Sequence, residues 1–464
     1  MMTFCGRRGA AILLAIATMA GGVAAVATVM IVQEFPGIPV APPAFTFAAA
    51  GDLGYTNTPD VVALARRVAA ANASFLLALG DLGYRPDEAA WCASIKGAFN
   101  DVEVVAGNHD TNETPGGDIA RYVAGCPFTL SVGLTGNAIT PGYGYEYYFD
   151  YPAVAPLARF ILISPGVEGT LGYNFSAGSV HAIWVESAVD DARARGIPWV
   201  IVGMHKQCIT VGEKTYCEMG KAIFNELVSL KVDLILQAHD HVYERSKQLA
   251  LQTGCSSVRS DGDFNAACIV AEPQNDTYAK GLGSVVVVQG VGGRSQDNVT
   301  LNGSDPELGY FASVMGGNAN TQNRSGGSGS VRYAVTRERI EVETDFCPDG
   351  SPGEDGSCPA RAVTTFHDRF AIVLSPSLSP STASGLTEVL ARVVALGPAS
   401  MVVMLAGVWT TNERRVGGAS GPSVFSESPA SRTPCPVPVV RERTKTSIYR
   451  HGKVYERWIQ WQSG

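Results

Sequence analysis

The sequence is short of charge, and shortest of positive charge. Charged residues make up 17% of the 464 residues, and 35 lysines and arginines face 43 aspartates and glutamates, which gives a net charge of −8. The body of the chain contains no basic block. Because nucleic-acid-binding surfaces depend on clustered positive charge, this balance argues against a nucleic-acid partner. The hydrophobic content of 46% is typical of a globular protein with one large or two ordinary domains.

Charge is missing altogether from a segment near the N-terminus. Arg7 and Arg8 precede an apolar run without any charged residue, residues 11–32. This pattern predicts that residues 1–32 are either a secretory signal peptide or a single-span signal anchor. The proline-rich residues 33–43 then predict a stiff linker.

A second apolar segment lies near the C-terminus. Residues 375–385 are rich in serine and proline and predict a linker, and residues 386–409 are mostly apolar. The charge-free part, 393–409, is at the short limit for a membrane span, so a span and a short amphipathic helix both stay open. The tail, 410–464, is basic, which favours the cytoplasmic side, and we expect it to be disordered. The oligomeric state stays open.

Ten cysteines suit an oxidising compartment, and eight of them lie between Cys92 and Cys358. Proximity in the sequence predicts four disulfides: Cys92–Cys126, Cys208–Cys217, Cys255–Cys268 and Cys347–Cys358. Seven asparagines begin N-x-S/T sequons: Asn72, Asn112, Asn174, Asn275, Asn298, Asn302 and Asn323. With the apolar leader, these features predict a secreted or membrane-tethered glycoprotein at the extracellular surface or in the lumen of the secretory pathway or a lysosome-like compartment.

Residues 44–374 contain β-α-β units first and consecutive strands later, which predicts an α/β fold with mixed sheets. Predicted strands are 44–50, 74–79, 102–106, 145–150, 159–164, 198–203, 233–237, 284–290, 331–336 and 367–374, and predicted helices are 59–72, 87–97, 179–194 and 218–230. Residues 291–330, rich in glycine, asparagine and serine, predict a long surface loop.

The pentapeptide GDLGY occurs twice, at 51–55 and at 80–84, each time directly after an apolar strand. A sheet commonly holds its active site at strand ends, so Asp52 and Asp81 are candidate functional residues. Similarity fades outside the pentapeptide, which disfavours an internal duplication. One chemical task needed at two neighbouring strand ends explains the repeat better.

Further strands also run into functional side chains. "VVAGNHD" (104–110), "VIVGMH" (200–205) and "LILQAHDHVYER" (234–245) end in asparagine, histidine or aspartate, and "VVVVQGVGG" (285–293) ends in glycines. Such groups do not gather at buried strand ends without a partner, and a pair of bound cations is the natural one. The mixed nitrogen and oxygen donors suit Fe, Mn or Zn.

Taken in order, the motifs Asp-x-Gly, Gly-Asp-x-x-Tyr, Gly-Asn-His-Asp, Val-x-x-His and His-x-His resemble the purple acid phosphatases within the calcineurin-like metallophosphoesterases. The stretch "HDHVYERS" is especially similar to that branch, although Ala238 replaces the usual glycine. The resemblance covers about 44–374. It implies a metallophosphoesterase catalytic domain there, built as an αββα sandwich of two mixed sheets flanked by helices.

The resemblance also implies a dinuclear metal centre. The first metal is expected on Asp52, Asp81, Tyr84 and His241, and the second on Asp81, Asn108, His205 and His239. Tyr84 is the expected tyrosinate of the purple branch, whereas Tyr55 in the identical pentapeptide is not. A phenol has a pKa of about 10, so a phenolate ligand at low pH implies Fe³⁺ at the first site. The second site would take Zn²⁺, Mn²⁺ or Fe²⁺.

By the same resemblance, a metal-bound hydroxide attacks phosphorus. His109 is expected to stabilise the transition state or to protonate the leaving group, and Asp110 either orients His109 or caps the turn. The implied function is a secreted or membrane-tethered acid phosphatase acting on phosphomonoesters. The alternatives are a phosphodiesterase or nucleotide pyrophosphatase on the same scaffold, and a surface receptor without activity.

Overall fold

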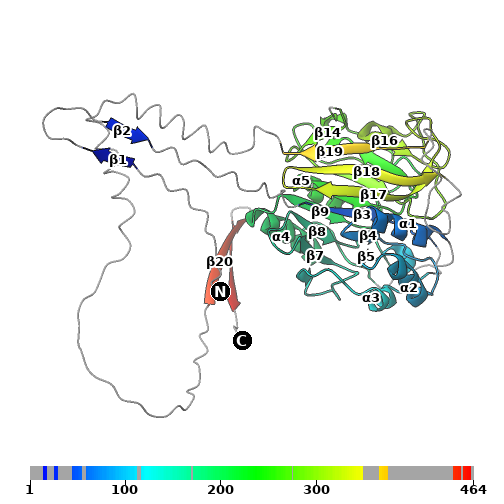
Figure 1. The fold of residues 1–464 in the computed structure, drawn as a ribbon, viewed down its shortest axis with the longest axis horizontal. Coiled ribbons are helices and arrows are strands. Elements are labelled where there is room, and N and C mark those ends of the chain that lie inside the picture. Colours follow the sequence, from blue (N-terminus) through cyan, green and yellow to red (C-terminus); the bar gives the residue numbers. More distant parts are fainter. Residues whose placement is uncertain are drawn as a thin grey trace, which may run out of the picture. The chain divides into compact units, whose positions relative to one another are not determined.

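We describe the protein from a computed structural model, which defines the structure of the chain in ten segments. These are residues 14–17, 26–29, 44–54, 59–111, 116–168, 171–273, 275–348, 365–374, 443–450 and 453–460. The segments between residues 44 and 374 contain two large sheets with helices packed on them (Figure 1).

One sheet has seven strands. In spatial order they are β14 (Thr277–Ala279), β19 (Arg369–Val373), β18 (Arg339–Pro348), β17 (Gly327–Val335), β3 (Phe45–Ala50), β4 (Phe75–Leu79) and β5 (Val102–Val105). Strands β3, β4 and β5 are parallel neighbours, and helices α1 (Pro59–Ala70) and α2 (Glu88–Ala98) connect them. The remaining half is antiparallel apart from β14, so the sheet is mixed.

The other sheet has eight strands. In spatial order they are β16 (Phe311–Met315), β11 (Tyr243–Ser246), β15 (Val285–Gln289), β10 (Leu234–Gln237), β9 (Trp199–Gly203), β8 (Ala158–Leu162), β7 (Tyr147–Tyr151) and β6 (Leu134–Gly136). Strands β8, β9, β10 and β15 are parallel, with α4 (Val180–Ala194) and α5 (Lys221–Ser229) between them in the chain. Both ends of this sheet are antiparallel.

The two sheets meet through aromatic side chains. Phe47 on β3 stacks on Phe75 with ring centroids 5.5 Å apart and on Tyr333 at 4.6 Å. Its edge meets Phe160 on β8 of the other sheet at 4.9 Å. All four side chains are buried, so this cluster forms part of the core between the sheets.

Alternation along the strands gives the eight-stranded sheet a second core on its other face. Phe160 points into the core between the sheets, whereas its neighbour Ile161 packs with Val185 on α4 and Phe224 on α5. On the seven-stranded sheet, α1 contacts β4 and β17. The expected αββα sandwich is therefore confirmed.

The four helices predicted from the sequence correspond to α1, α2, α4 and α5. The prediction of a surface loop over 291–330 is wrong in part. The apolar run "FASVM" inside it forms β16, which pairs with β11 at the edge of the sheet, and β17 begins at Gly327. Four further strands of the two sheets were not predicted: β6, β11, β14 and the ten-residue β18. The short elements were not predicted either: α3 (Ile119–Gly125), β12 (Gln248–Leu249), β13 (Ile269–Ala271), and the 3-10 turns Asn108–Asp110, Ala266–Cys268 and Pro306–Tyr310.

Three of the four predicted disulfides are present: Cys92–Cys126, Cys208–Cys217 and Cys255–Cys268. Cys358 of the fourth pair lies outside the described residues. Of the seven sequon asparagines, Asn112 also lies outside them, and the other six are all exposed. Glycosylation stays a prediction.

The chain divides into two units, Met1–Pro380 and Ser381–Gly464. In the first, β1 (Leu14–Ala17) and β2 (Val26–Val29) pair within the predicted leader; in the second, β20 (Arg443–Arg450) and β21 (Lys453–Gln460) pair within the tail expected to be disordered. No helix among the described residues has the length and apolar character to span a membrane. The expected linkers and residues 386–409 fall outside that description.

Candidate metal centre

The predicted ligands lie at the carboxyl ends of parallel strands from both sheets. Strands β3, β4 and β5 lead into Asp52, Asp81 and Asn108, and strands β9 and β10 lead into the histidines. Because neighbouring parallel strands end at the same edge of a sheet, their following residues gather there. The structure brings all seven predicted ligands into two groups of contacting atoms: Asp52, Asp81, Tyr84, Asn108, His205, His239 and His241.

One group contains the predicted ligands of the second metal. The Nε2 atom of His205 lies 3.2 Å from Asp81 Oδ1, 3.1 Å from Asn108 Oδ1 and 3.1 Å from His239 Nδ1. Ligand atoms bound at about 2.0–2.2 Å to a shared ion lie roughly 3–3.5 Å apart. All four residues are buried. The donor atoms therefore fit around one ion.

The other group contains predicted ligands of the first metal. Asp52 Oδ1 lies 2.8 Å from the Tyr84 hydroxyl and 3.3 Å from His241 Nε2, and the hydroxyl lies 3.3 Å from the same nitrogen. This triangle has the same spacing as the other group. Among the contacts of the described residues, the Asp81 carboxylate belongs to the second group, so its bridging role stays a prediction.

Several predicted ligands occupy strained backbone conformations. Asp52, Asp81, Tyr84 and His239 have φ of 56°, 50°, 55° and 70°, and they are four of the eleven non-glycine residues with positive φ in the described segments. Each such conformation costs on the order of 1–3 kcal/mol and persists only where its surroundings determine it. Here the backbone N–H of His239 donates to Asp52 Oδ2 at 2.8 Å, a hydrogen bond that joins the two ligand groups.

Two histidines are oriented by backbone carbonyls that the sequence analysis did not identify. The Nδ1 atom of His205 lies 2.9 Å from the Leu79 carbonyl, and Nδ1 of His241 lies 2.9 Å from the Ser295 carbonyl. Since a carbonyl only accepts, each Nδ1 carries the hydrogen and each Nε2 keeps its lone pair for a metal. A single sequence does not indicate these contacts, because the Leu79 carbonyl belongs to strand β4 and the Ser295 carbonyl to a loop, both distant in sequence from the histidine they contact.

Electrostatics also favours a cation here. Burial, followed by the Asp52 and Asp81 carboxylates, raises the pKa of the Tyr84 phenol well above its usual value. Burial would raise the pKa of Asp81 as well, but the His205 imidazole outweighs it and holds that pKa low. A tyrosinate beside two carboxylates requires a strongly Lewis-acidic ion to balance it. The residues present thus fit a metal centre.

The two predicted catalytic residues differ in their contacts. The His109 side chain is 28% exposed, and its ring centroid lies 4.5 Å from that of Tyr84. The backbone N–H of His109 donates to Asp81 Oδ1 at 2.9 Å. The Asp110 carboxylate instead accepts from the N–H groups of Gly107 at 2.8 Å and Leu82 at 3.0 Å. These contacts match the turn-capping alternative for Asp110 rather than the orientation of His109.

Arg294 is a further residue at the site that the sequence analysis missed. Its guanidinium lies 5.0 Å from the centroid of the Tyr84 ring, and its backbone N–H donates to the Asp52 backbone carbonyl at 3.0 Å. It follows β15 and the glycine-rich stretch 290–293. That strand-to-glycine pattern was visible in the sequence, but nothing in it indicated that the next residue reaches the Tyr84 ring.

Comparisons with known proteins agree with this geometry. Residues 45–243 match the model of the calcineurin-like phosphoesterase family. The chain is 26% identical over 221 residues to Purple acid phosphatase 1 of Ipomoea batatas, a match that covers 44% of each protein. It is 28% identical over 216 residues to an uncharacterised protein of Mycobacterium tuberculosis, covering 39% of this chain and 37% of that one. The chain thus matches less than half the length of these curated relatives.

Among solved structures, purple acid phosphatase PPD1 from yellow lupin seeds aligns with a TM-score of 0.47 and 12% identity, over 73% of this chain and 55% of that one. The match of residues 45–243 to the calcineurin-like phosphoesterase model confirms the family expected from the sequence motifs. The sequence similarity to Purple acid phosphatase 1 supports the purple acid phosphatase branch of that family.

Proposed function

We propose that the protein is an acid phosphatase that hydrolyses phosphomonoesters at a dinuclear metal centre. The observation that carries this proposal is the presence of two groups of donor atoms, with Tyr84 in the first group and two histidines in the second. A tyrosine beside a carboxylate favours Fe³⁺ at the first site, and the nitrogen-rich second group favours Zn²⁺, Mn²⁺ or Fe²⁺. The disulfides support a secretory or extracellular location.

Bound metal ions would supply the Lewis acidity that activates water and neutralises phosphoryl oxygens. The chain's own residues do the rest. The strand ends position the ligand side chains. His109 is partly exposed beside Tyr84, so its ring is placed to donate a hydrogen bond or a proton to the leaving oxygen of a phosphoester. The nearby Arg294 guanidinium adds positive charge that favours a phosphate group.

A substrate panel with metal analysis tests the proposal. The full chain, purified without chelators, should contain two metal ions and hydrolyse p-nitrophenyl phosphate faster than bis-p-nitrophenyl phosphate under acidic conditions. His205→Ala should lose activity, whereas His367→Ala, a change outside the ligand groups, should retain it. Faster turnover of the diester would replace phosphatase by phosphodiesterase. Two bound ions without turnover of any phosphoester would indicate a receptor.

A further inference from the structure

The outer nitrogen of His239 contacts two side chains of opposite charge. His239 Nε2 lies 3.0 Å from Glu218 Oε2 and 2.9 Å from Lys206 Nζ, and these two groups lie 2.6 Å from each other. Lys206 and His239 are buried, and Glu218 is half-buried. The three side chains form a closed triangle directly behind a predicted metal ligand.

The two neighbours favour opposite tautomers of the imidazole. His239 Nδ1 faces the second ligand group, 3.1 Å from His205 Nε2, and binds a metal only with a free lone pair. A neutral imidazole then carries its hydrogen on Nε2, and the Glu218 carboxylate accepts it. The Lys206 ammonium can only donate, so it favours the tautomer in which Nε2 has no hydrogen and accepts. In that tautomer Nδ1 carries the hydrogen and cannot bind a metal.

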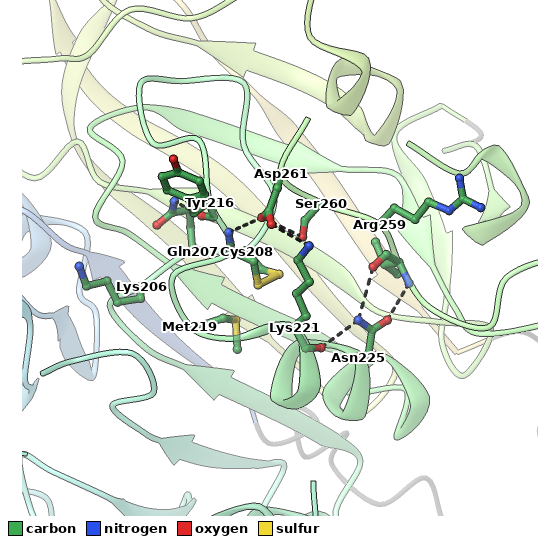
Figure 2. The surroundings of a disulfide bond; sticks show 12 residues. Lys206, Gln207, Cys208, Tyr216, Met219, Lys221, Asn225, Arg259, Ser260 and Asp261 are labelled. Atoms are coloured by element: carbon green, nitrogen blue, oxygen red, sulfur yellow. Dashed lines mark hydrogen bonds and ion pairs between the residues drawn. A yellow bond between two sulfur atoms is a disulfide. The ribbon is translucent and has the colours of Figure 1, made fainter. Parts of the chain in front are cut away.

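The chain places Glu218 by closing a loop. The Cys208–Cys217 disulfide closes it, Lys206 stands two residues before the first cysteine, and Glu218 directly follows the second. Figure 2 shows the Lys206 side chain extending away from the disulfide, whereas the Cys217 N–H donates to Asp261 on the other side at 2.8 Å.

Three buried carboxylates hold the same loop through its backbone. The hydrogen bonds run from Thr210 N to Glu307 Oε2 at 3.0 Å, from Val211 N to Glu244 Oε1 at 2.8 Å and from Lys214 N to Asp240 Oδ2 at 3.3 Å. Because the loop is fixed both by its cross-link and by its backbone, its two ends meet at His239 with little freedom.

We propose that Glu218 is a positioning residue that selects the metal-binding tautomer of His239, and that Lys206 keeps the Glu218 carboxylate in place. The proposal rests on the metal centre of the proposed function. Without Glu218, the Lys206 ammonium still lies beside Nε2, and it then favours the tautomer with the hydrogen on Nδ1. The second metal is then bound more weakly, while the ligand atoms themselves are unchanged.

Zinc titration of the metal-stripped full chain against a chromophoric chelator tests this. Loss of an outer-shell partner of a metal-bound histidine typically costs 10–100-fold in affinity, so Glu218→Ala should weaken one of the two zinc sites by at least about tenfold. Lys206→Met added to Glu218→Ala should recover much of that loss, because the competing donor is gone. Glu218→Gln should bind nearly as well as the native chain, because its amide oxygen still accepts from Nε2.

The matched control is Glu213→Ala, an exposed glutamate on the same loop, which should bind zinc like the native chain. Unchanged affinity in Glu218→Ala would overturn the proposal, as would a double variant that binds no better than Glu218→Ala. Should Glu218→Ala fail to fold, the Glu218→Gln result decides: a loss of ten-fold or more there overturns the tautomer account. Native protein that binds fewer than two zinc ions would instead contradict the dinuclear centre.

Discussion

The two GDLGY copies have one sequence and two conformations. In the first copy, φ is positive at Asp52 and Gly54; in the second, it is positive at Gly80, Asp81 and Tyr84. Both copies follow neighbouring parallel strands, β3 and β4, so the preceding structure is also alike. The difference must come from what each copy packs against, because local propensity is identical in the two.

The surroundings of the two copies do differ. The Asp52 carboxylate accepts from the His239 N–H, whereas Asp81 packs against Gly107, where a β-carbon would lie 2.2 Å from its Oδ1 atom. Tyr84 lies between Asp52 and His109. Tyr55, its counterpart in the first copy, is outside the described residues. Tertiary contacts therefore give the two aspartates different tasks.

The strongest test of that difference is to remove each aspartate in turn. If Asp81 bridges the ions, Asp81→Ala should release both, because that carboxylate serves each site. Asp52→Ala should release only the first metal and leave the second largely bound. Metal analysis of the purified variants gives the answer. Release of a single ion by Asp81→Ala would show that the two copies are more alike than we infer.

His109 is the next residue to test, because its ring lies against Tyr84 and its backbone N–H donates to Asp81, both in the second copy. His109→Ala should keep both metals and lower kcat by about 10²–10⁴-fold, the usual contribution of an acid–base group. The loss should be larger for alkyl phosphates, whose leaving groups need a proton, than for p-nitrophenyl phosphate. Equal losses on both substrates would assign His109 to substrate binding or metal orientation.

A smaller effect should separate the two tyrosines. Tyr84→Phe should abolish any visible charge-transfer band of a ferric protein, weaken the first metal and shift the pH profile of activity. Tyr55→Phe, the matched change in the other copy, should leave the absorption spectrum as it is. Bleaching by Tyr55→Phe alone, or a colourless native protein with oxidised iron bound, would contradict the tyrosinate assignment.

The smallest expected effect is on stability rather than chemistry. Glu103 pairs with Leu77 on the strand that leads into the second copy, and burial raises its pKa from 4.5 to about 7. Its ionisation therefore costs stability progressively as pH rises from about 4.5 to 7, at about 1.4 kcal/mol per pKa unit. Glu103→Gln should be more stable than the native chain by up to about 3 kcal/mol above pH 7 and equal to it near pH 4.

Thermal unfolding of the native chain and Glu103→Gln across this pH range provides the measurement. The same curves are needed to interpret the variants of the second copy, because a pH-dependent loss of folded protein would otherwise be taken for a pH-dependent change in catalysis. A stability difference that is the same at pH 4 and pH 8 would show that Glu103 does not titrate between those values.

The strand-end motifs were enough to place Asp52, Asp81, Asn108, His205 and His239 just after strands, and their resemblance to a known family implied the two sheets and the ligand groups. They could not predict the partners that orient those ligands. The Ser295 carbonyl, Glu218 and Arg294 reach the site from distant loops, and a single sequence does not show which loops meet. The strand β16 was missed for a related reason, since its five apolar residues lie among turn-forming ones and gain their pairing only from β11.

The origin of the ligands on two sheets has a thermodynamic consequence. Asp81 and Asn108 follow strands of the seven-stranded sheet, whereas His205 and His239 follow strands of the eight-stranded one, yet all four donors meet in one group. An ion bound there holds the two sheets together, so the stability of their packing depends on the concentration of that ion. Free metal at a hundredfold excess over its Kd adds about 2.7 kcal/mol to the stability of the native state. The metal concentration would then determine the stability of the folded domain as well as its catalytic rate.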